Sequence, residues 1–397
     1  MSKVIIRKKA NTLYRLFAMC PGGLEEVLKI ELKALGMIIR NVYVGGIEFE
    51  GDLATAYTAC LSLRTASRVL LLLQETKRVS HPDELYQAVS TVEWYKVFEP
   101  TSTFAVYLTE THTEERKEIL NPQYMALKAK DAIADHFRKR FNERPNVDRK
   151  DPDITIRLHL HDQILKIYLD LSGKSLHQRG YRSETLEAPL KENLAAGLLY
   201  LAGWHEKIKT KEAFYDPFCG SGTILIEAAM MATRTPPGLF RQGFGFYSWK
   251  DHQPNLFEKI HNELRENIIT DPDELPMMVG SDIDAAAINV AQQNIENANL
   301  SQVIKLKIGA FEKSIPFAPK GLIVTNPPYG VRMGEVEEMM QLYGAIGSTF
   351  KHQYKNWNAG VISSEKKFLQ AISLKPSKKF SLHNGGLDSL FYVFNLY

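Results

Sequence analysis

Three short apolar runs in the second half of the chain each end in a polar or glycine-rich motif. The runs cover residues 214–215, 277–281 and 322–325, and the residues that follow them are Asp216, Asp282 and Asn326. Helical patterns follow the first two runs, and the alternation of buried strands with helices predicts a doubly wound α/β sheet. Since such sheets bind ligands at the carboxyl ends of their strands, we expect a site where these three residues meet.

The first motif is the turn Asp216-Pro-Phe-Cys-Gly-Ser-Gly-Thr223, from which a helix leaves directly. Gly220 and Gly222 would let the backbone approach a ligand closely, and the helix N-terminus would offer free N–H groups. The motif is not a phosphate-binding loop, because no Gly-Lys-Ser/Thr follows, and Leu225 rules out Gly-x-Gly-x-x-Gly. A purely structural turn is the alternative, but the preceding Asp-Pro favours a ligand site.

The second motif is the strand end at Asp282. An acid in this position suits the hydroxyls of a ribose, and Ile283 would then lie flat against an adenine ring. Asp284 occupies a helix N-cap position, which we favour over a ligand contact. Asp282 follows Asp216 by 66 residues (282 − 216), against about 20 in the dinucleotide-binding fingerprint, so residues 233–275 are an insertion. The insertion either contacts a substrate or covers one edge of the sheet.

The third motif, Asn326-Pro-Pro-Tyr-Gly330, follows a buried strand about 100 residues after the glycine-rich turn. Its two prolines remove backbone donors, so local carbonyl groups can face outward as acceptors. The carbonyl oxygens of Asn326 and Pro327 could converge on the amino group of a base, and Tyr329 could stack on that base. Such a site would place the amine in line with a sulfonium methyl group, so that proximity and electrostatics carry a methyl transfer.

The first half of the chain predicts two small α+β units. At about 150 residues per domain, 397 residues suggest two or three domains. Gly, Asn and Pro become more frequent from Gly173 onward, which predicts a domain boundary between residues 165 and 190. We therefore predict domains at 1–70, 71–165 and 166–397. A hairpin is expected around Gly45-Gly46, and two alternating strands are expected at 154–160 and 165–171.

Positive charge gathers in the second unit, although the formal net charge of the chain is only +3. Between residues 128 and 150, eight Lys and Arg side chains oppose four Asp and Glu, a local excess of +4. Lys128, Lys139 and Arg140 lie on a predicted helix that begins at Asn121-Pro122. Charged helix faces are common, so a solvated face competes with a nucleic-acid contact as the explanation.

Seven stretches of the sequence resemble the THUMP-containing class I RNA methyltransferases, and most closely the N-terminal, guanine-N2 methyltransferase half of the RlmL-type 23S rRNA enzymes. The glycine-rich turn and Asn326-Pro-Pro-Tyr-Gly330 are similar to motifs I and IV of the amino-methyltransferases. The other matching stretches are Pro21-Gly-Gly-Leu-Glu-Glu26, Gly45-Gly-Ile-Glu-Phe49, Leu63-Arg-Thr-Ala-Ser-Arg-Val69, Leu171-Ser-Gly-Lys-Ser-Leu-His-Gln-Arg-Gly-Tyr-Arg182 and Ala188-Pro-Leu-Lys-Glu192. The resemblance covers essentially the whole chain. It implies a ferredoxin-like domain, a THUMP RNA-binding domain and a Rossmann-like methyltransferase domain, in that order.

The resemblance also assigns roles to individual residues, with S-adenosylmethionine as the cofactor. It implies that Asp216, Gly220, Gly222, Pro189 and Glu192 surround the methionine end of the cofactor, that Asp282 and Ile283 hold its nucleoside, and that Phe311 flanks the adenine. Asn326, Pro327 and Tyr329 would receive the target amine, and Lys128, Lys139, Arg140, Arg179 and Arg182 would contact RNA. For Arg179 and Arg182, salt bridges at the domain interface are an equal alternative. Gly309-Ala310 stands where relatives carry an acid, which Glu312 would have to replace.

We therefore expect an RNA methyltransferase that acts on an exocyclic base amine, most specifically guanine N2 of 23S rRNA. The alternatives are an adenine-N6 nucleic-acid methyltransferase and a non-catalytic RNA-binding factor of ribosome assembly. Because the chain ends at Tyr397, one methyltransferase activity is expected rather than two. The three scattered cysteines fit no disulfide framework or zinc cluster. With no membrane or export signal either, a cytoplasmic protein without a metal or a membrane partner is expected.

Overall fold

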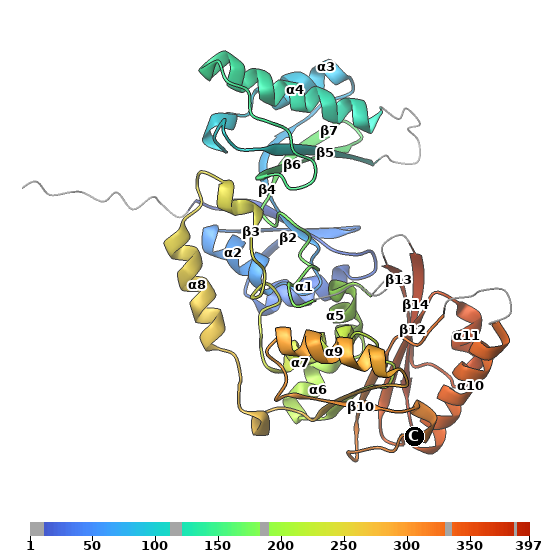
Figure 1. Ribbon diagram of the computed structural model, residues 1–397. Coiled ribbons are helices and arrows are strands. Elements are labelled where there is room, and N and C mark those ends of the chain that lie inside the picture. The colour runs from blue at the N-terminus through green and yellow to red at the C-terminus, as the bar shows by residue number, and fades with distance from the viewer. Residues whose placement is uncertain (1–11, 112–120, 183–189, 330–335, 385–386) are drawn as a thin grey trace, which may run out of the picture.

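A computed structural model describes residues 12–111, 121–182, 190–329, 336–384 and 387–397 (Figure 1). It contains two seven-stranded sheets. The N-terminal sheet has the strand order β2-β3-β1-β4-β7-β6-β5, and the C-terminal sheet has the order β10-β9-β8-β11-β12-β14-β13. No helix among the described residues is long and apolar enough to cross a membrane.

The N-terminal sheet is continuous across the two predicted small domains. Its elements are β1 (Tyr14–Met19), α1 (Glu25–Ala34), β2 (Ile38–Tyr43), β3 (Gly46–Gly51), α2 (Leu53–Ser62), β4 (Arg68–Thr76), α3 (Pro82–Ser90), η1 (Trp94–Lys96), β5 (Phe104–Thr111), α4 (Pro122–Phe141), β6 (Ile154–His161) and β7 (Ile164–Asp170). Strand β4 pairs with β1 on one side and with β7 on the other. The boundary predicted between residues 70 and 71 therefore falls inside β4, and the domain limits stay a prediction.

Helix α4, which carries the predicted basic face, has well-defined ends. The side chain of Asn121 accepts hydrogen bonds from the N–H groups of Gln123 and Tyr124, and Pro122 occupies the first turn. The helix stops at Asn142, whose φ of 56° is left-handed. The helix lies on β5 (Figure 1), and its buried residues are apolar: Met125, Ala129, Ala132, Ile133, Ala134 and Phe137.

The C-terminal sheet is the predicted doubly wound α/β sheet with an antiparallel hairpin added at one edge. Its elements are α5 (Glu192–Leu201), α6 (Trp204–Lys207), η2 (Ile208–Thr210), β8 (Ala213–Asp216), α7 (Thr223–Ala232), η3 (Gly245–Ser248), α8 (Pro254–Glu266), η4 (Pro272–Glu274), β9 (Met278–Asp282), α9 (Ala285–Asn297), β10 (Ile304–Ile308), η5 (Phe311–Lys313), β11 (Gly321–Thr325), α10 (Val336–His352), β12 (Asn358–Ser363), α11 (Lys366–Ala371), β13 (Lys378–Asn384) and β14 (Leu387–Asn395). Strands β8 to β12 are parallel, and β14 is antiparallel to both β12 and β13.

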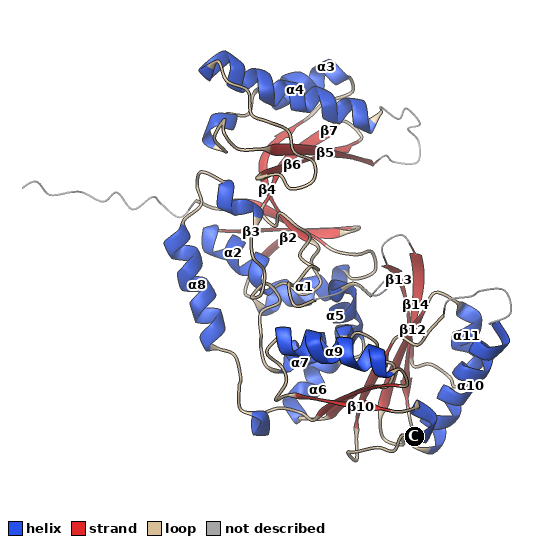
Figure 2. Ribbon diagram, viewed as in Figure 1, coloured by secondary structure: helices blue, strands red, loops and turns tan. Residues whose placement is uncertain are grey.

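Helices cover both faces of this sheet (Figure 2). Successive residues of β11 alternate between the two sides, as the period of a strand requires. Leu322 and Val324 belong to the core that includes α5 and α7, whereas Ile323 belongs to a second core with Tyr343 and Phe350 of α10.

The insertion of residues 233–275 packs against the N-terminal unit. The hydroxyl of Tyr57 in α2 lies 2.7 Å from Nδ1 of His252 and accepts from the N–H of Gln253 at 2.9 Å. Phe246 and Phe257 place their rings against Tyr57. The aromatic run of the insertion therefore forms an interface between the two halves of the chain, rather than a cover over one edge of the sheet.

Candidate functional site

The carboxyl ends of β8, β9 and β11 bring the three predicted strand-end residues to one edge. Strand β8 lies between β9 and β11, with Asp216 beside Gly280 and with Tyr215 beside Ile323. Asp216, Asp282 and Asn326 therefore end neighbouring strands, which are about 4.8 Å apart in a sheet. Residues separated by more than a hundred positions in the sequence meet here.

Asp216 lies below the surface of this edge. Its side chain is 1% exposed, and its Oδ1 accepts from the hydroxyl of Thr325 at 2.7 Å and from the N–H of Phe218 at 3.4 Å. Burial raises the pKa of the Asp216 carboxyl to about 7. The carboxyl thus ties the glycine-rich turn to the strand that ends at Asn326, a connection through Thr325 that the sequence does not reveal.

Asp216→Asn is expected to remove a pH dependence of stability. The folded-state pKa of Asp216 lies above the usual aspartate value of 3.8, so the folded protein holds this proton more tightly than the unfolded chain does. The free energy of unfolding therefore falls between about pH 4 and pH 7, by roughly 4 kcal/mol for three pKa units. Asparagine does not ionise, so the free energy of unfolding of the variant, relative to that of the parent, should rise as the pH increases over that interval.

Urea unfolding of both proteins at pH 5 and pH 8 measures this difference. Asp284→Asn is the matched control, because it removes an exposed carboxylate from the same edge. A stability difference between Asp216→Asn and the parent that stays constant between the two pH values would contradict the assignment.

The glycine-rich turn has the geometry that its sequence predicts. Gly220 and Gly222 have φ of 52° and 83°, in the left-handed region that favours glycine. A Cβ atom at Gly220 would meet no described atom within 4 Å, so the backbone there faces open space. Helix α7 begins immediately afterwards at Thr223 and directs its N-terminus toward the same edge. The turn can therefore admit a ligand close to the main chain.

Asp282 is already engaged with the turn. Its Oδ2 accepts from the N–H of Gly220 at 3.0 Å, and its Oδ1 accepts from the N–H of Asp284 at 3.0 Å. Ile283 is 74% exposed and offers an apolar face beside this carboxylate. Asp284 caps α9 by accepting from Ala286, which confirms the N-cap prediction.

Asn326 carries an unpaired buried acceptor. Its Oδ1 is shielded from solvent and has no hydrogen-bond partner among the residues that the structure describes. Such an orphaned acceptor costs about 1–3 kcal/mol unless a ligand supplies a donor. Pro327 is buried beside it, and Tyr329 is half-buried, with a pKa that burial raises. These features are those of a site that is completed by a hydrogen-bond donor from outside.

Phe311 does not flank an open pocket, which corrects the sequence expectation. Its ring is 2% exposed and packs against Tyr215, Phe218 and Tyr354. The short helix η5 turns this ring into the core, where burying an aromatic side chain is most favourable. Phe311 therefore supports the wall beneath the site without offering a face to a ligand, and Glu312 is exposed next to it.

Glu192 and Arg182 pair with each other. Nε of Arg182 lies 2.7 Å from Oε1 of Glu192, and the guanidinium also donates to the carbonyl of Leu190 and the hydroxyl of Thr223 at 2.8 Å each. Burial raises the pKa of Glu192. The pair joins the start of α5 to the start of α7 within the C-terminal unit, so the salt bridge of Arg182 does not lie at the domain interface, and its RNA contact stays a prediction. Pro189 lies outside the described residues.

Arg179 cannot contact RNA in this structure, contrary to the sequence expectation. It is 1% exposed, and its guanidinium donates to Glu227, to the carbonyl of Leu176 and to the carbonyl of Arg64. Arg64 in turn donates to Met230 and Thr235. The two arginines join the N-terminal unit to the C-terminal sheet, so burial at that interface rather than phosphate binding explains Arg179.

The predicted basic residues of α4 have mixed surroundings. Lys128 lies 3.4 Å from Asp83, whereas Lys139 and Arg140 are exposed at the end of the helix. The guanidinium of Arg140 lies 3.8 Å from the centre of the Tyr95 ring, a cation–π contact. Lys139 and Arg140 are therefore the members of this set that remain available to a polyanion.

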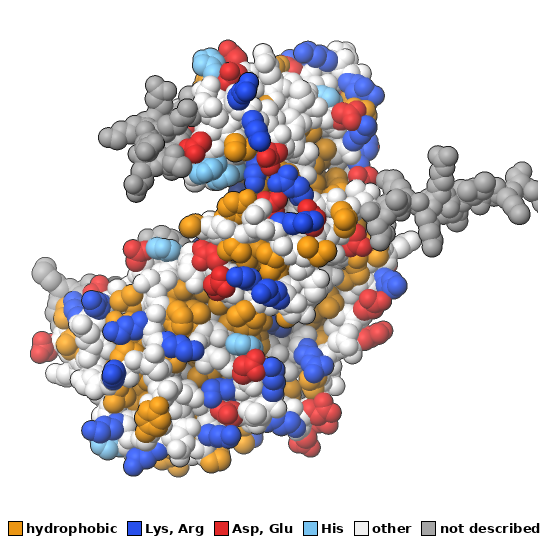
Figure 3. All heavy atoms as spheres, turned by 180° about the vertical axis from the view of Figure 1, so that it is seen from behind, with side chains coloured by type: hydrophobic (Ala, Val, Ile, Leu, Met, Phe, Trp, Pro, Cys, Tyr) orange, Lys and Arg blue, Asp and Glu red, His pale blue; other side chains and the backbone are white. Residues whose placement is uncertain are grey.

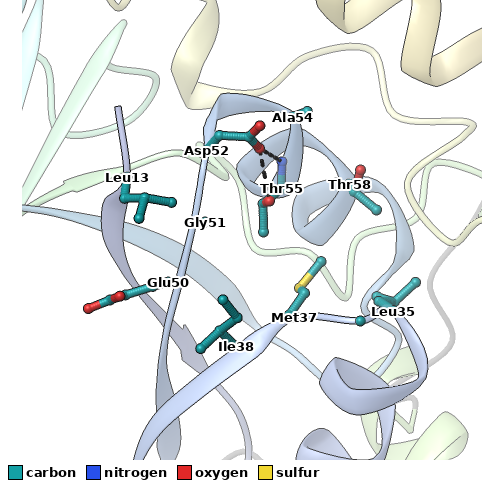
Figure 4. Close-up of a pocket in the computed structure, with 11 residues that line it drawn as sticks. Leu13, Leu35, Met37, Ile38, Glu50, Gly51, Asp52, Ala54, Thr55 and Thr58 are labelled. Atoms are coloured by element: carbon teal, nitrogen blue, oxygen red, sulfur yellow. Dashed lines mark hydrogen bonds between the residues drawn. The ribbon is translucent and has the colours of Figure 1, made fainter. Parts of the chain in front are cut away.

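A pocket of about 360 Å³ lies elsewhere, in the N-terminal unit (Figure 4). Its lining includes Leu13, Met37, Ile38 and Thr55. The nearby carboxylate of Asp52 is used to cap α2 through Thr55. None of the strand-end residues lines it, so it does not belong to the candidate site. Among the described residues no cluster of His, Cys, Asp or Glu could hold a metal ion.

A sheet of this order, with a glycine-rich turn after β8, an acid after β9 and Asn-Pro-Pro-Tyr after β11, defines the Rossmann-like class I methyltransferases. The chain belongs to the family of RMKL-like methyltransferase domains, whose sequence profile matches residues 179–392. Profiles of the RlmL ferredoxin-like domain and of the THUMP domain match residues 15–70 and 79–170. The predicted fold class and family are thereby confirmed.

Similar proteins agree with this assignment. A ribosomal RNA large subunit methyltransferase K/L of Syntrophotalea carbinolica is 38% identical over 386 residues, which are 96% of this chain and 53% of the relative. The chain thus spans about half the length of the curated relatives it matches. The crystal structure of SMU.472, named as a putative methyltransferase and complexed with SAH, has a TM-score of 0.85 at 29% identity, covering 98% of this chain and 99% of the other. A structure named as a predicted N6-adenine-specific DNA methylase from Listeria monocytogenes has a TM-score of 0.84 at 28% identity, covering 97% of each chain.

Proposed function

We propose that this protein transfers a methyl group from S-adenosylmethionine to an exocyclic base amine of RNA, namely guanine N2 of 23S rRNA, in the cytoplasm. The observation that carries the proposal is the buried, unpaired Oδ1 of Asn326 at the carboxyl edge of the sheet. An exocyclic amine supplies the donor that this oxygen lacks. The large-subunit rRNA methyltransferases that resemble this chain support RNA as the substrate.

The residues at the β8 and β9 ends fit the cofactor. The open backbone at Gly220 leaves room for its methionine end, and the exposed Ile283 can lie against its adenine. The carboxylate of Asp282, which holds the turn in place, is positioned to accept from the ribose hydroxyls as well. When bound, S-adenosylmethionine supplies an electrophilic methyl group on a sulfonium ion.

The Asn326 end of the site would prepare the amine. Hydrogen bonds from the amine to Asn326 and to the carbonyl of Pro327 draw its nitrogen out of the plane of the base and expose the lone pair. Tyr329 stacks on the base and fixes its orientation. Because the acceptors are already in place and partly shielded from water, they stabilise developing positive charge on the nitrogen without reorganisation. No strong base is needed.

The N-terminal unit would hold the surrounding RNA. A base inside a helix cannot reach the pocket, so the target nucleotide must be single-stranded or flipped out of the stack. Lys139 and Arg140 at the exposed end of α4 are proposed RNA contacts. The THUMP profile over residues 79–170 supports that assignment, since it describes the unit that carries both residues.

One experiment tests the proposal and separates the alternatives. The protein is incubated with methyl-labelled S-adenosylmethionine and either unmodified 23S rRNA or duplex DNA, and the nucleic acid is digested to nucleosides. Label in N2-methylguanosine is the expected result. Label in N6-methyladenine would replace the proposal with adenine methylation, which the name of the Listeria structure suggests for that protein. Tight rRNA binding without transfer would indicate an assembly factor.

A further inference from the structure

The last part of the chain carries a local excess of positive charge. Residues 351–397 contain seven lysines against Glu365 and Asp388, a net charge of +5 (7 − 2), while the whole chain has +3. Five of the lysines fall within fourteen residues on α11, on β13 and on the loop between them. They are Lys366, Lys367, Lys375, Lys378 and Lys379, and all five are exposed. We call this set the C-terminal lysine surface.

These lysines keep their charge available. Of the five, only Lys367 has a carboxylate near it among the described residues, Glu365 at 3.9 Å. By contrast, the basic side of α4 is partly neutralised by its own acids, since Lys130 lies 3.0 Å from Asp131 and Arg138 lies 2.6 Å from Asp135. A phosphate that approaches the C-terminal lysine surface therefore does not have to displace an internal partner.

The position of the surface matches the side from which a substrate must come. The proposed cofactor residues follow β8 and β9, so the cofactor fills that half of the carboxyl edge, and β11 stands at the middle. The other half consists of β12, β14 and β13. Helix α11 begins at Lys366, three residues after β12 ends at Ser363, so Lys366 and Lys367 lie near the carboxyl edge. Strand β13 runs in the direction of β12, and Lys378 and Lys379 at its start lie level with Gly360 and Val361 of β12, farther from that edge.

The N-terminal unit adjoins this half of the sheet. A Cβ atom on Gly22 would lie 2.7 Å from Cδ2 of His383, and one on Gly23 would lie 2.5 Å from the carbonyl oxygen of Ser381. The turn after β1 is therefore packed directly on the β13–β14 hairpin. Figure 3 shows Lys and Arg side chains spread over the lower left of the molecule, where the C-terminal elements lie. The N-terminal unit thus lies against the hairpin whose first strand carries Lys378 and Lys379.

Protection of a sheet edge is the competing explanation. Lysines on an edge strand prevent pairing with another chain, and this accounts for Lys378 and Lys379 on β13. It does not account for Lys366 and Lys367 on a helix, nor for Lys375 in a loop. A polyanion that runs along the surface accounts for all five, because each neutralised phosphate contributes to binding.

We propose that the C-terminal lysine surface binds the phosphates of the RNA strand that flanks the target base. This proposal rests on the proposed function. It adds an RNA contact within the catalytic domain, on the substrate side of Asn326, to those of the N-terminal unit. The N-terminal unit would then hold the RNA at one end and the lysines would hold it beside the pocket.

The test compares two variants with the same change in charge. The lysine-surface variant is K366Q/K367Q/K378Q/K379Q. The control variant is K29Q/K209Q/K250Q/K259Q, in which each lysine lies near a surface carboxylate, at Glu26, Glu206, Glu99 and Glu263 respectively. The Kd for unmodified 23S rRNA is measured between 50 and 200 mM KCl. S-adenosylmethionine binding confirms that both variants are folded.

We expect the lysine-surface variant to bind rRNA roughly 10–100-fold more weakly at 100 mM salt, and its salt slope to fall by about 3, at about 0.7–0.9 for each of the four lost contacts. The control should change affinity less than threefold. An equal loss in both variants, or an unchanged slope, would overturn the proposal. Because binding is measured without transfer, a parent protein that binds rRNA but methylates nothing would contradict the proposed function and leave this surface intact.

Discussion

Asn326→Ala should lower the rate constant of methyl transfer by on the order of 10²–10³-fold, the usual effect of removing one preorganised polar group from an active site. The affinity for S-adenosylmethionine should change less than twofold, because the cofactor residues lie on β8 and β9. Single-turnover transfer to saturating 23S rRNA measures the first quantity, and calorimetric titration with the cofactor measures the second. A fall in cofactor affinity as large as the fall in rate would refute the assigned role.

The same substitution should not destabilise the protein. The buried Oδ1 of Asn326 has no partner in the described structure, so alanine removes an unsatisfied polar atom. The thermal midpoint is expected to equal that of the parent or exceed it. Asn358→Ala is the matched control, since Asn358 begins β12 at the amino end of the strand, away from the carboxyl edge, and its side-chain nitrogen donates to Oδ1 of Asn395. That control should leave the rate of transfer unchanged.

The sequence predicted the strand-end residues because each strand end is a local feature. A short apolar run followed by an acid or by Asn-Pro-Pro indicates where a strand ends and which side chain lies at its end. The parallel order then follows from the intervening helices. The Gly45-Gly46 hairpin and the N-cap at Asp284 were predicted for the same reason, since turns and caps depend on neighbouring residues alone.

What the sequence did not reveal depends on distant partners. Arg179 pairs with Glu227, 48 residues away, and no local pattern separates such an arginine from one that binds phosphate. The hydroxyl of Thr325 reaches Asp216 across 109 positions. The ring of Phe311 packs inward as part of the second hydrophobic core. These are choices of tertiary packing, and a pattern along the chain carries little information about them.

The continuity of the N-terminal sheet was missed for a related reason. Strand β4 was predicted correctly as a strand, but a strand in a sequence does not say how many neighbours it has. Pairing with both β1 and β7 makes β4 shared by two units that the motifs describe as separate domains. The RNA contacts proposed on α4 are thereby connected, through the N-terminal sheet, to the turn after β1 that packs on the β13–β14 hairpin.

Arg179→Ala should destabilise the protein by roughly 3–5 kcal/mol, the usual cost of leaving one partner of a buried ion pair alone. The change would leave the fully buried Glu227 without its charged partner, and the carbonyls of Leu176 and Arg64 without their donor. Urea unfolding followed by tryptophan fluorescence measures the loss. Lys139→Ala, an exposed site on α4, should stay within about 0.5 kcal/mol of the parent.

A double variant separates the loss of the charge pair from the loss of packing. Arg179→Met combined with Glu227→Leu removes both charges and keeps most of the volume, so it should recover a large part of the stability that Arg179→Ala loses. The rRNA affinity of the folded double variant should match that of the parent, because Arg179 is enclosed between the N-terminal unit and α7 and cannot touch a phosphate. If rRNA binding weakens tenfold while stability is unaffected, Arg179 returns to the role of an RNA contact. The opposite result, reduced stability with unchanged rRNA affinity, indicates that Arg179 acts by joining the N-terminal unit to α7 through Arg64 and Glu227.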